Sequence, residues 1–176
     1  RDLIDIGFST DEVKAIASEY TVLDGPNDEG EMFERSAKSS DHFVSPYANE
    51  QEARLSNNGS YPPDLSVITK AKKYGADYIY NLLVGYSDPP EDFELGEGMY
   101  YNKWKEGHQI AMSQPLDDGY VDYDDGTENT LPQLAEDVTT FLVWSAEPEL
   151  EERKRIGLKV LLFFIIAGAL VYIVKN

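Results

Sequence analysis

The sequence predicts a mainly α-helical protein with long irregular segments and one C-terminal helix that crosses a membrane. Apolar residues recur at helical spacing in several stretches of the chain. Glycine, proline and acidic residues interrupt the chain between those stretches. The last stretch, residues 160–174, is apolar on every face and lies near the end of the chain. A length of 176 residues suits one domain with a modest core and an added anchor.

Two helices are predicted in the first third of the chain. Residues 11–20 form the first, because Glu12 follows Ser9 by three residues, as in a capping box. Residues 49–56 form the second, and an Asn-Asn-Gly sequence ends it because these residues accept the left-handed conformation. Between them, residues 23–47 lack a sustained period, so we expect a long irregular segment. Segments of this kind often carry function or wrap a ligand.

Three more helical stretches are predicted before the anchor. A pair of prolines enforces an extended entry, after which helical spacing covers residues 65–72 and then residues 77–84. Residues 87–132 are again irregular and rich in acidic side chains. Thr130 stands two residues before a proline, which the first turn of a helix tolerates, so the next helix begins there.

The predicted anchor begins after a boundary between residues 147 and 148. Residues 1–147 form an acidic domain and residues 148–176 the anchor. The last apolar run has 15 residues, fewer than the roughly 20 that span a hydrocarbon core, but it extends to residues 156–174 because Lys159 can snorkel. A buried core helix is the alternative, and the apolar surface on every face favours the span. The flanking charges leave its orientation open.

Charge and cysteine content exclude several classes of function. Residues 151–176 hold two of the 33 acidic and five of the 15 basic side chains, which leaves 31 against 10 and a formal charge of −21 in residues 1–150. Such a surface repels nucleic acid and attracts a basic partner. Without cysteine, the chain forms no disulfide, iron–sulfur site or thioether bond to haem. With two histidines, it offers little for acid–base catalysis, so we expect the chemistry to belong to a cofactor.

Three segments, residues 24–33, 57–66 and 137–154, together resemble the cytochrome c1 family in order and spacing. The resemblance covers nearly the whole chain. It implies a cytochrome c-like haem domain with long wrapping loops and one C-terminal transmembrane helix. In that family the subunit has no independent active site. It passes electrons within ubiquinol–cytochrome c reductase, the bc1 complex or complex III, from the Rieske iron–sulfur protein through haem c to soluble cytochrome c.

The resemblance also implies a location and partners. The location is the mitochondrial inner membrane with the domain in the intermembrane space, or the bacterial inner membrane with the domain in the periplasm. The partners are cytochrome b, the Rieske iron–sulfur protein and soluble cytochrome c, with an acidic hinge subunit as a further candidate, in a dimeric complex. The acidic stretches around residues 91–97 and 117–128 either recruit such partners or serve solubility alone.

Met112 is the first candidate ligand. The segment 107–112 resembles the family segment that ends in the axial methionine of the haem iron. A thioether opposite a histidine favours ferrous haem and raises its potential. A methionine beside Ile110 and Ala111 would otherwise be read as core filler.

The same resemblance assigns the haem pocket to nine further positions. These are Asn57, Pro62, Pro63, Leu65, Ile68, Lys72, Tyr78, Leu82 and Leu83. The apolar ones would exclude water, and Tyr78 would donate its hydroxyl to a propionate; an ordinary helical core is the alternative. Lys72 departs from the family's usual arginine, so it keeps the charge but loses the bidentate fork.

The family's Cys-x-x-Cys-His motif, which attaches the haem and supplies the other axial ligand, is absent from the sequence. In the family it lies shortly before the position of Arg1. We therefore expect it on a missing upstream segment or on a separate N-terminal cytochrome c1 fragment. His42 and His108 are interpreted as surface or pocket-rim residues. A haem-free, membrane-anchored acidic docking or assembly module is the alternative function, which bound haem would exclude.

Overall fold

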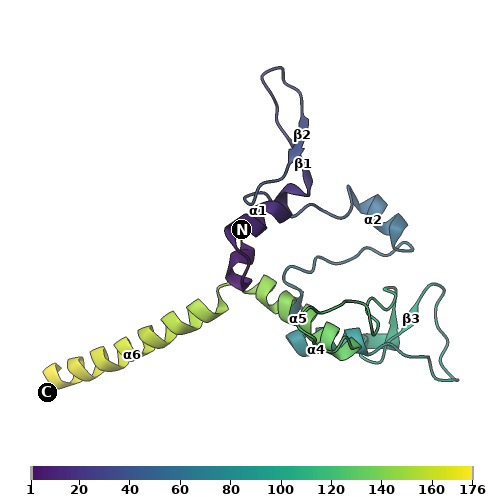
Figure 1. The fold of residues 1–176 in the computed structure, drawn as a ribbon. Helices are drawn as coiled ribbons and strands as arrows, with labels where there is room; N and C mark the ends of the chain where they lie inside the picture. Colours follow the sequence, from purple (N-terminus) through teal and green to yellow (C-terminus); the bar gives the residue numbers. More distant parts are fainter. Residues whose placement is uncertain (1, 176) are drawn as a thin grey trace. The chain divides into compact units, whose positions relative to one another are not determined.

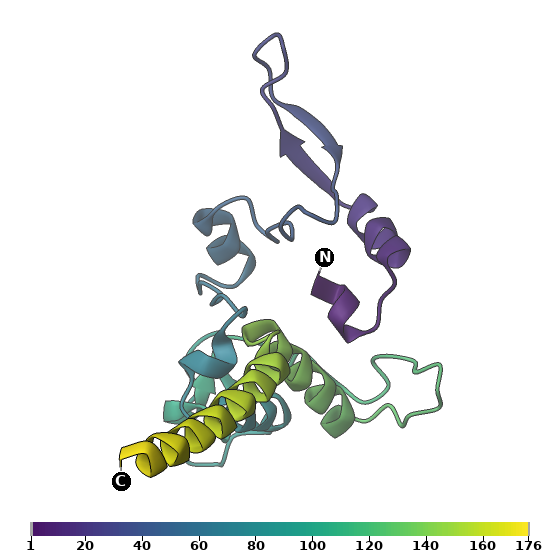
Figure 2. The same ribbon diagram turned by 90° about the vertical axis from the view of Figure 1, so that its left-hand side faces the viewer.

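The structure, a computed structural model, describes residues 2–175, and Figures 1 and 2 show its elements. The chain divides into two compact units, Arg1–Tyr61 and Pro62–Asn176, which we describe separately. This division falls within the predicted domain, residues 1–147, and does not test the predicted boundary between that domain and the anchor. The boundary at residue 147 stays a prediction.

The first unit is built from short elements. They are η1 (Asp2–Ile6), α1 (Thr10–Ser18), β1 (Thr21–Asp24), β2 (Phe33–Ser36) and α2 (Glu50–Ser56). The predicted capping box opens α1: the Glu12 amide donates to the Ser9 hydroxyl at 3.3 Å, and the Ser9 amide donates to the Glu12 carboxylate at 2.7 Å. The predicted Asn-Asn-Gly ending of α2 is also confirmed, because Asn58 (φ 50°) and Gly59 (φ 84°) adopt positive φ.

The prediction of an irregular segment over residues 23–47 was wrong in part. Strands β1 and β2 form an antiparallel hairpin in which Thr21 pairs with Ser36 and Asp24 pairs with Phe33. Each strand has only four residues and most of their side chains are exposed, so no alternation of apolar and polar residues marked them in the sequence.

The second unit contains the longer helices. Its elements are α3 (Ile68–Ala71), α4 (Gly75–Val84), β3 (Tyr100–Tyr101), η2 (Glu106–His108), β4 (Gln109–Ile110), α5 (Leu131–Ala146) and α6 (Leu150–Lys175). The helix expected over residues 65–72 is reduced to the single turn α3. Tyr74 (φ 69°) and Gly75 (φ 52°) have positive φ, which separates α3 from α4. Within the irregular stretch 87–132, β3 and β4 form a small antiparallel pair.

The core of the second unit lies between α3, α4 and α5. It consists of Ile68, Ile79, Leu83 and Ala135, which are all buried. Helices α4 and α5, labelled in Figure 1, pack against each other. Burial of each large aliphatic side chain stabilises the unit by about 1.5–3 kcal/mol. This small core fixes the orientation of α4.

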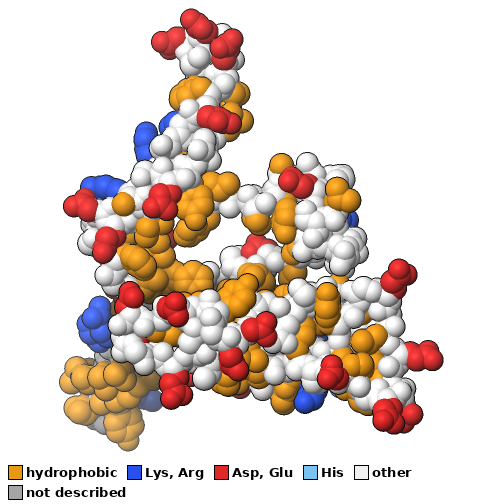
Figure 3. All heavy atoms as spheres, turned by 45° about the vertical axis from the view of Figure 1, so that its right-hand side comes forward, with side chains coloured by type: hydrophobic (Ala, Val, Ile, Leu, Met, Phe, Trp, Pro, Cys, Tyr) orange, Lys and Arg blue, Asp and Glu red, His pale blue; other side chains and the backbone are white. Residues whose placement is uncertain are grey.

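Helix α6 is long and apolar enough to cross a membrane, and none of its residues is buried within the structure. Its 26 residues extend about 39 Å at a rise of about 1.5 Å per residue, against a hydrocarbon core of about 30 Å. Figure 3 shows its hydrophobic side chains as a continuous surface at the lower left. The predicted fold class, mainly α with one C-terminal helix suited to a membrane, is confirmed.

Candidate functional site

Helix α4 carries three of the predicted site residues. Leu83 is buried in the core, whereas Tyr78 and Leu82 are half-buried. Burial raises the pKa of the Tyr78 hydroxyl, and the nearby negative charge of Glu106 raises it further. The phenol therefore stays protonated at neutral pH and can donate a hydrogen bond.

The chain that leads into α4 carries five more predicted residues. Ile68 is buried in α3, where it belongs to the helical core, whereas Leu65 before it is 52% exposed. Pro62 is half-buried, and Pro63 is exposed. Lys72 follows α3 with an extended backbone and an exposed side chain. The stretch thus offers apolar side chains and a cation to solvent.

Met112 lies two residues after β4, and its side chain is 42% exposed. The core-filler interpretation of this methionine was therefore wrong. The Tyr86 hydroxyl donates a hydrogen bond to the backbone carbonyl of Met112 at 3.1 Å. Because Tyr86 follows the end of α4 by two residues, this bond ties the methionine to α4.

Asn102 is a structural residue that the sequence did not reveal. Its side chain is fully buried and is the largest with this degree of burial among the described residues. Its side-chain amide donates to the carbonyl of Leu82, the predicted pocket residue in the last turn of α4, at 2.8 Å. An asparagine between a tyrosine and a lysine carries no pattern from which this contact could be foreseen.

Both histidines have exposed side chains, in agreement with their interpretation as surface residues. His108 stacks on Tyr101 with ring centroids 5.8 Å apart, and Phe93 meets the Tyr101 ring edge-on at 5.0 Å. His42 belongs to the first unit, where it helps to line a cavity of about 60 Å³.

Asn57 is the one predicted site residue that belongs to the first unit. Its side-chain amide donates to the Tyr47 hydroxyl at 3.0 Å and to the Ala53 carbonyl at 2.7 Å. The second bond satisfies a carbonyl in the last turn of α2. The described contacts of this amide are therefore local ones that close a helix.

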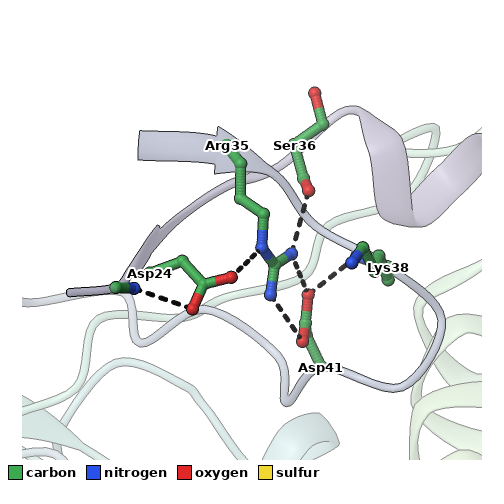
Figure 4. Close-up of polar contacts among 6 residues, drawn as sticks. Asp24, Arg35, Ser36, Lys38 and Asp41 are labelled. Atoms are coloured by element: carbon green, nitrogen blue, oxygen red, sulfur yellow. Dashed lines mark hydrogen bonds and ion pairs between the residues drawn. The ribbon is translucent and has the colours of Figure 1, made fainter. Parts of the chain in front are cut away.

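A charged cluster, which we call the Arg35 cluster, fixes the hairpin of the first unit (Figure 4). The Arg35 guanidinium donates to Asp24, to both carboxylate oxygens of Asp41 at 2.6 and 3.2 Å, and to the Ser36 carbonyl at 3.0 Å. The Lys38 amide also donates to Asp41, at 2.8 Å. The bonds from Arg35 and Lys38 lower the pKa of Asp41 to about 2.

A second charged group lies where α5 gives way to α6. Glu147, which ends α5, accepts from the Lys70 ammonium at 3.0 Å and from the Arg153 guanidinium at 2.6 Å. These bonds lower the pKa of its carboxyl group. One carboxylate thus joins α3 to the first turns of the C-terminal helix.

Comparison with known proteins decides the family. The model of the cytochrome C1 family matches residues 1–176. The chain belongs to the cytochrome C1 family. This membership confirms the resemblance that three segments of the sequence indicated.

Curated relatives of this cytochrome C1 family member come from plants, fungi and bacteria. "Cytochrome c1 1, heme protein, mitochondrial" of Arabidopsis thaliana is 52% identical over 90% of this chain and 52% of its own length. "Cytochrome b-c1 complex catalytic subunit, mitochondrial" of Candida albicans is 49% identical over 92% of the chain and 56% of its own length. "Cytochrome b/c1" of Bradyrhizobium diazoefficiens is 46% identical over the whole chain and 29% of its own length. The chain spans about half the length of the plant and fungal relatives.

The second unit of this family member presents a consistent set of chemical groups. Met112, which is 42% exposed, offers a thioether, which is a soft metal ligand. Lys72 offers a cation and Tyr78 a protonated hydroxyl. Leu65 and Val67 are 52% and 51% exposed and would be covered by a large apolar ligand. The set suits a ligand that is apolar, carries a metal and bears anionic groups.

Proposed function

We propose that this chain is part of the cytochrome c1 subunit of ubiquinol–cytochrome c reductase and passes electrons from the Rieske iron–sulfur protein through haem c to soluble cytochrome c. Met112 carries this proposal, because this residue is 42% exposed, its backbone carbonyl is bonded to the Tyr86 hydroxyl just after α4, and the chain matches the family over residues 1–176. The helix to which Tyr86 connects this segment, α4, also carries the predicted pocket residues Tyr78 and Leu82, which supports a role for Met112 as a ligand.

The residues of the second unit fit a haem group by their chemistry. A haem is a flat apolar macrocycle that carries iron and two propionates, so it needs a metal ligand, apolar cover and polar partners. Met112 offers the metal ligand, and Leu65 and Val67 offer apolar cover. Lys72 and the protonated hydroxyl of Tyr78 offer the polar partners. When bound, haem c supplies a reversible one-electron couple of its iron.

Each predicted residue has a role in this proposal. The Met112 thioether would ligate the iron and raise the potential. Tyr78 would donate its hydroxyl to a propionate, and Lys72 would pair with a propionate through a single point charge, which holds it less tightly than an arginine fork would. The family resemblance assigns the remaining residues to the pocket, where the last five would exclude water: Asn57, Pro62, Pro63, Leu65, Ile68, Leu82 and Leu83.

The attachment of the haem follows from cysteine chemistry. A c-type haem is bound through thioether bonds to cysteine, and this sequence contains no cysteine. We propose that the attachment and the proximal histidine come from residues outside it, on an upstream segment or a separate chain.

Helix α6 would anchor the chain in the mitochondrial inner membrane, with the domain in the intermembrane space, or in the bacterial inner membrane, with the domain in the periplasm. The proposed neighbours are cytochrome b, the Rieske iron–sulfur protein and an acidic hinge subunit within a dimeric complex. The charge of −21 in residues 1–150 would steer basic cytochrome c to the domain, an effect that salt weakens. Acidic side chains outnumber basic ones on the face shown in Figure 3.

The test is the substitution Met112→Ala in the complete subunit within the detergent-purified complex. We expect a c-type spectrum in the reduced-minus-oxidised difference, a haem stain on a denaturing gel, and a lower midpoint potential for the variant. The potential falls because a weaker ligand, such as water, would replace the thioether. An unchanged potential would remove Met112 as the ligand.

Met32→Ala is the matched control, because Met32 is 55% exposed but belongs to the first unit. It should leave the potential unchanged. If no c-type haem were found anywhere in the complex, the haem-free docking module would be the better description of this chain.

A further inference from the structure

Asn102 occupies the centre of a tight loop that precedes Met112. Its side-chain oxygen accepts from the backbone amides of Trp104 at 3.0 Å and Lys105 at 3.2 Å, and its backbone amide donates to the His108 carbonyl at 3.0 Å. These three bonds close the loop formed by residues 102–108. It leads directly into β4, which pairs with β3 and ends two residues before Met112.

The same side chain attaches this loop to α4. Its amide nitrogen donates to the Leu82 carbonyl, one of the last four carbonyls of α4, which otherwise accepts only a longer bond of 3.4 Å from the Gly85 amide among the described contacts. The Lys103 amide adds a bond to the Gly85 carbonyl at 3.0 Å. The arrangement determines the orientation of the Asn102 amide, since two backbone donors face its oxygen and one backbone acceptor faces its nitrogen.

Gly85 shows how closely the loop and α4 approach each other. A Cβ atom at this position would lie 2.6 Å from the Trp104 ring, 2.6 Å from the Asn81 carbonyl and 3.1 Å from the Asn102 side-chain oxygen. The backbone of Gly85 (φ −88°, ψ 1°) does not itself demand glycine. A side chain at Gly85 is excluded because neighbouring atoms already occupy the space. The close contact therefore fixes the position of the loop along α4.

We propose that Asn102 is a positioning residue that holds the Met112 segment, residues 109–112, in register with α4 so that the thioether stays on the iron. The inference rests on the proposed function, because it requires Met112 to be the axial ligand. The Tyr86 hydroxyl supplies a second attachment at the far end of the segment. With Asn102 at its base and Tyr86 near its tip, the segment has little freedom to move away from α4.

The test is Asn102→Ala in the complete subunit within the purified complex. We expect unchanged c-type haem content but loss of the weak red charge-transfer band that ferric haem shows with methionine as a ligand. We also expect carbon monoxide binding by the ferrous haem, a lower midpoint potential, and faster hydrogen exchange at the amides of Trp104 and Lys105. Asn81→Ala is the control, because the Asn81 amide donates at 2.7 Å within α4 itself, to the Asp77 carbonyl. It should retain the band.

Asn102→Ser is the second test variant, to be used if the complex that carries Asn102→Ala does not accumulate. The shorter hydroxyl can still accept from the loop amides but cannot reach the Leu82 carbonyl, so we expect partial loss of the band and some carbon monoxide binding. Retention of the band and the potential in an assembled Asn102 variant would overturn the positioning role.

Met112→Ala in the same series separates the two proposals. If Met112→Ala abolishes the band and Asn102→Ala does not, the positioning role fails and the ligand assignment stands. If Met112→Ala leaves the band intact, the ligand assignment fails, and the positioning role fails with it.

Discussion

The two units stabilise their irregular segments by opposite means. In the first, the Arg35 cluster fixes the hairpin with charged side chains, and the Arg35 side chain is 23% exposed. In the second, the neutral amide of Asn102 fixes the Met112 segment with no exposure at all. Charged groups near water depend on pH and salt, whereas a buried amide depends on geometry. The segment that carries the proposed ligand is thus the one held by a buried group that does not titrate.

The largest effect is expected from Gly85→Ala, which tests the geometric side of this comparison. The added methyl group would meet backbone and ring atoms at 2.6 Å, and overpacking of this kind destabilises by about 1–3 kcal/mol. We expect the unfolding midpoint of the subunit in the complex to fall by several degrees in a thermal scan. Gly96→Ala is the control, since its nearest contacts lie at 3.2 and 3.3 Å and belong to flexible side chains. Equal midpoints for the two variants would contradict the tight register.

A smaller effect is expected from Tyr86→Phe, which removes only the hydroxyl that bonds the Met112 carbonyl. Loss of one such hydrogen bond costs about 0.5–1.5 kcal/mol. Burial raises the pKa of Tyr86 to about 12, so the hydroxyl is protonated throughout the working pH range and its contribution should not vary with pH. We expect a small decrease in midpoint potential and faster hydrogen exchange over residues 109–112. Tyr123→Phe, which loses a hydroxyl bond to Asp137, should change neither quantity, because neither Tyr123 nor Asp137 is a predicted site residue.

The smallest effect is expected from Asp41→Asn, because a charged contact near water is screened; the variant should lose stability of the hairpin above pH 3.8 and show a flatter pH dependence below it. The pKa of Asp41 lies at about 2 in the folded protein, below its ordinary value of 3.8. The ionised carboxylate therefore stabilises the hairpin above pH 3.8, and this contribution is lost as the pH falls from 3.8 towards 2. Hydrogen-exchange protection factors of β1 and β2 should decline across this window in the parent and less steeply in the variant. Parallel curves would show that Asp41 does not couple to the hairpin.

Local signals predicted the helices well. The capping box at Ser9 and Glu12, the asparagine–glycine ending of α2 and the all-round apolar surface of α6 each depend on neighbouring residues only, and each occurs in the structure. The resemblance of three segments indicated the family, which the family match confirms.

Contacts between distant residues could not be predicted from the same signals. Asn102 meets Leu82 across 20 positions of sequence, and Arg35 meets Asp24 across 11. Neither contact leaves a periodic pattern, because each depends on how a loop meets a helix or two strands meet in space. The roles of the ten predicted site residues stay predictions for the same reason, although the structure shows that Met112 is exposed and that Ile68 and Leu83 are core residues.

The Glu147 carboxylate has a mechanical consequence. It is shared by Lys70 and Arg153, so bending of the chain between α5 and α6 must first break a charged contact on one side. The two ion pairs restrain this junction, and because the Lys70 and Arg153 side chains are 50% and 61% exposed, each contributes up to about 1 kcal/mol. In the proposed role this limits how far the domain can sway above the lipid surface. The rate of electron tunnelling decays exponentially with the distance between donor and acceptor. In the proposed role, a restrained junction would therefore narrow the range of electron-transfer rates from one turnover to the next.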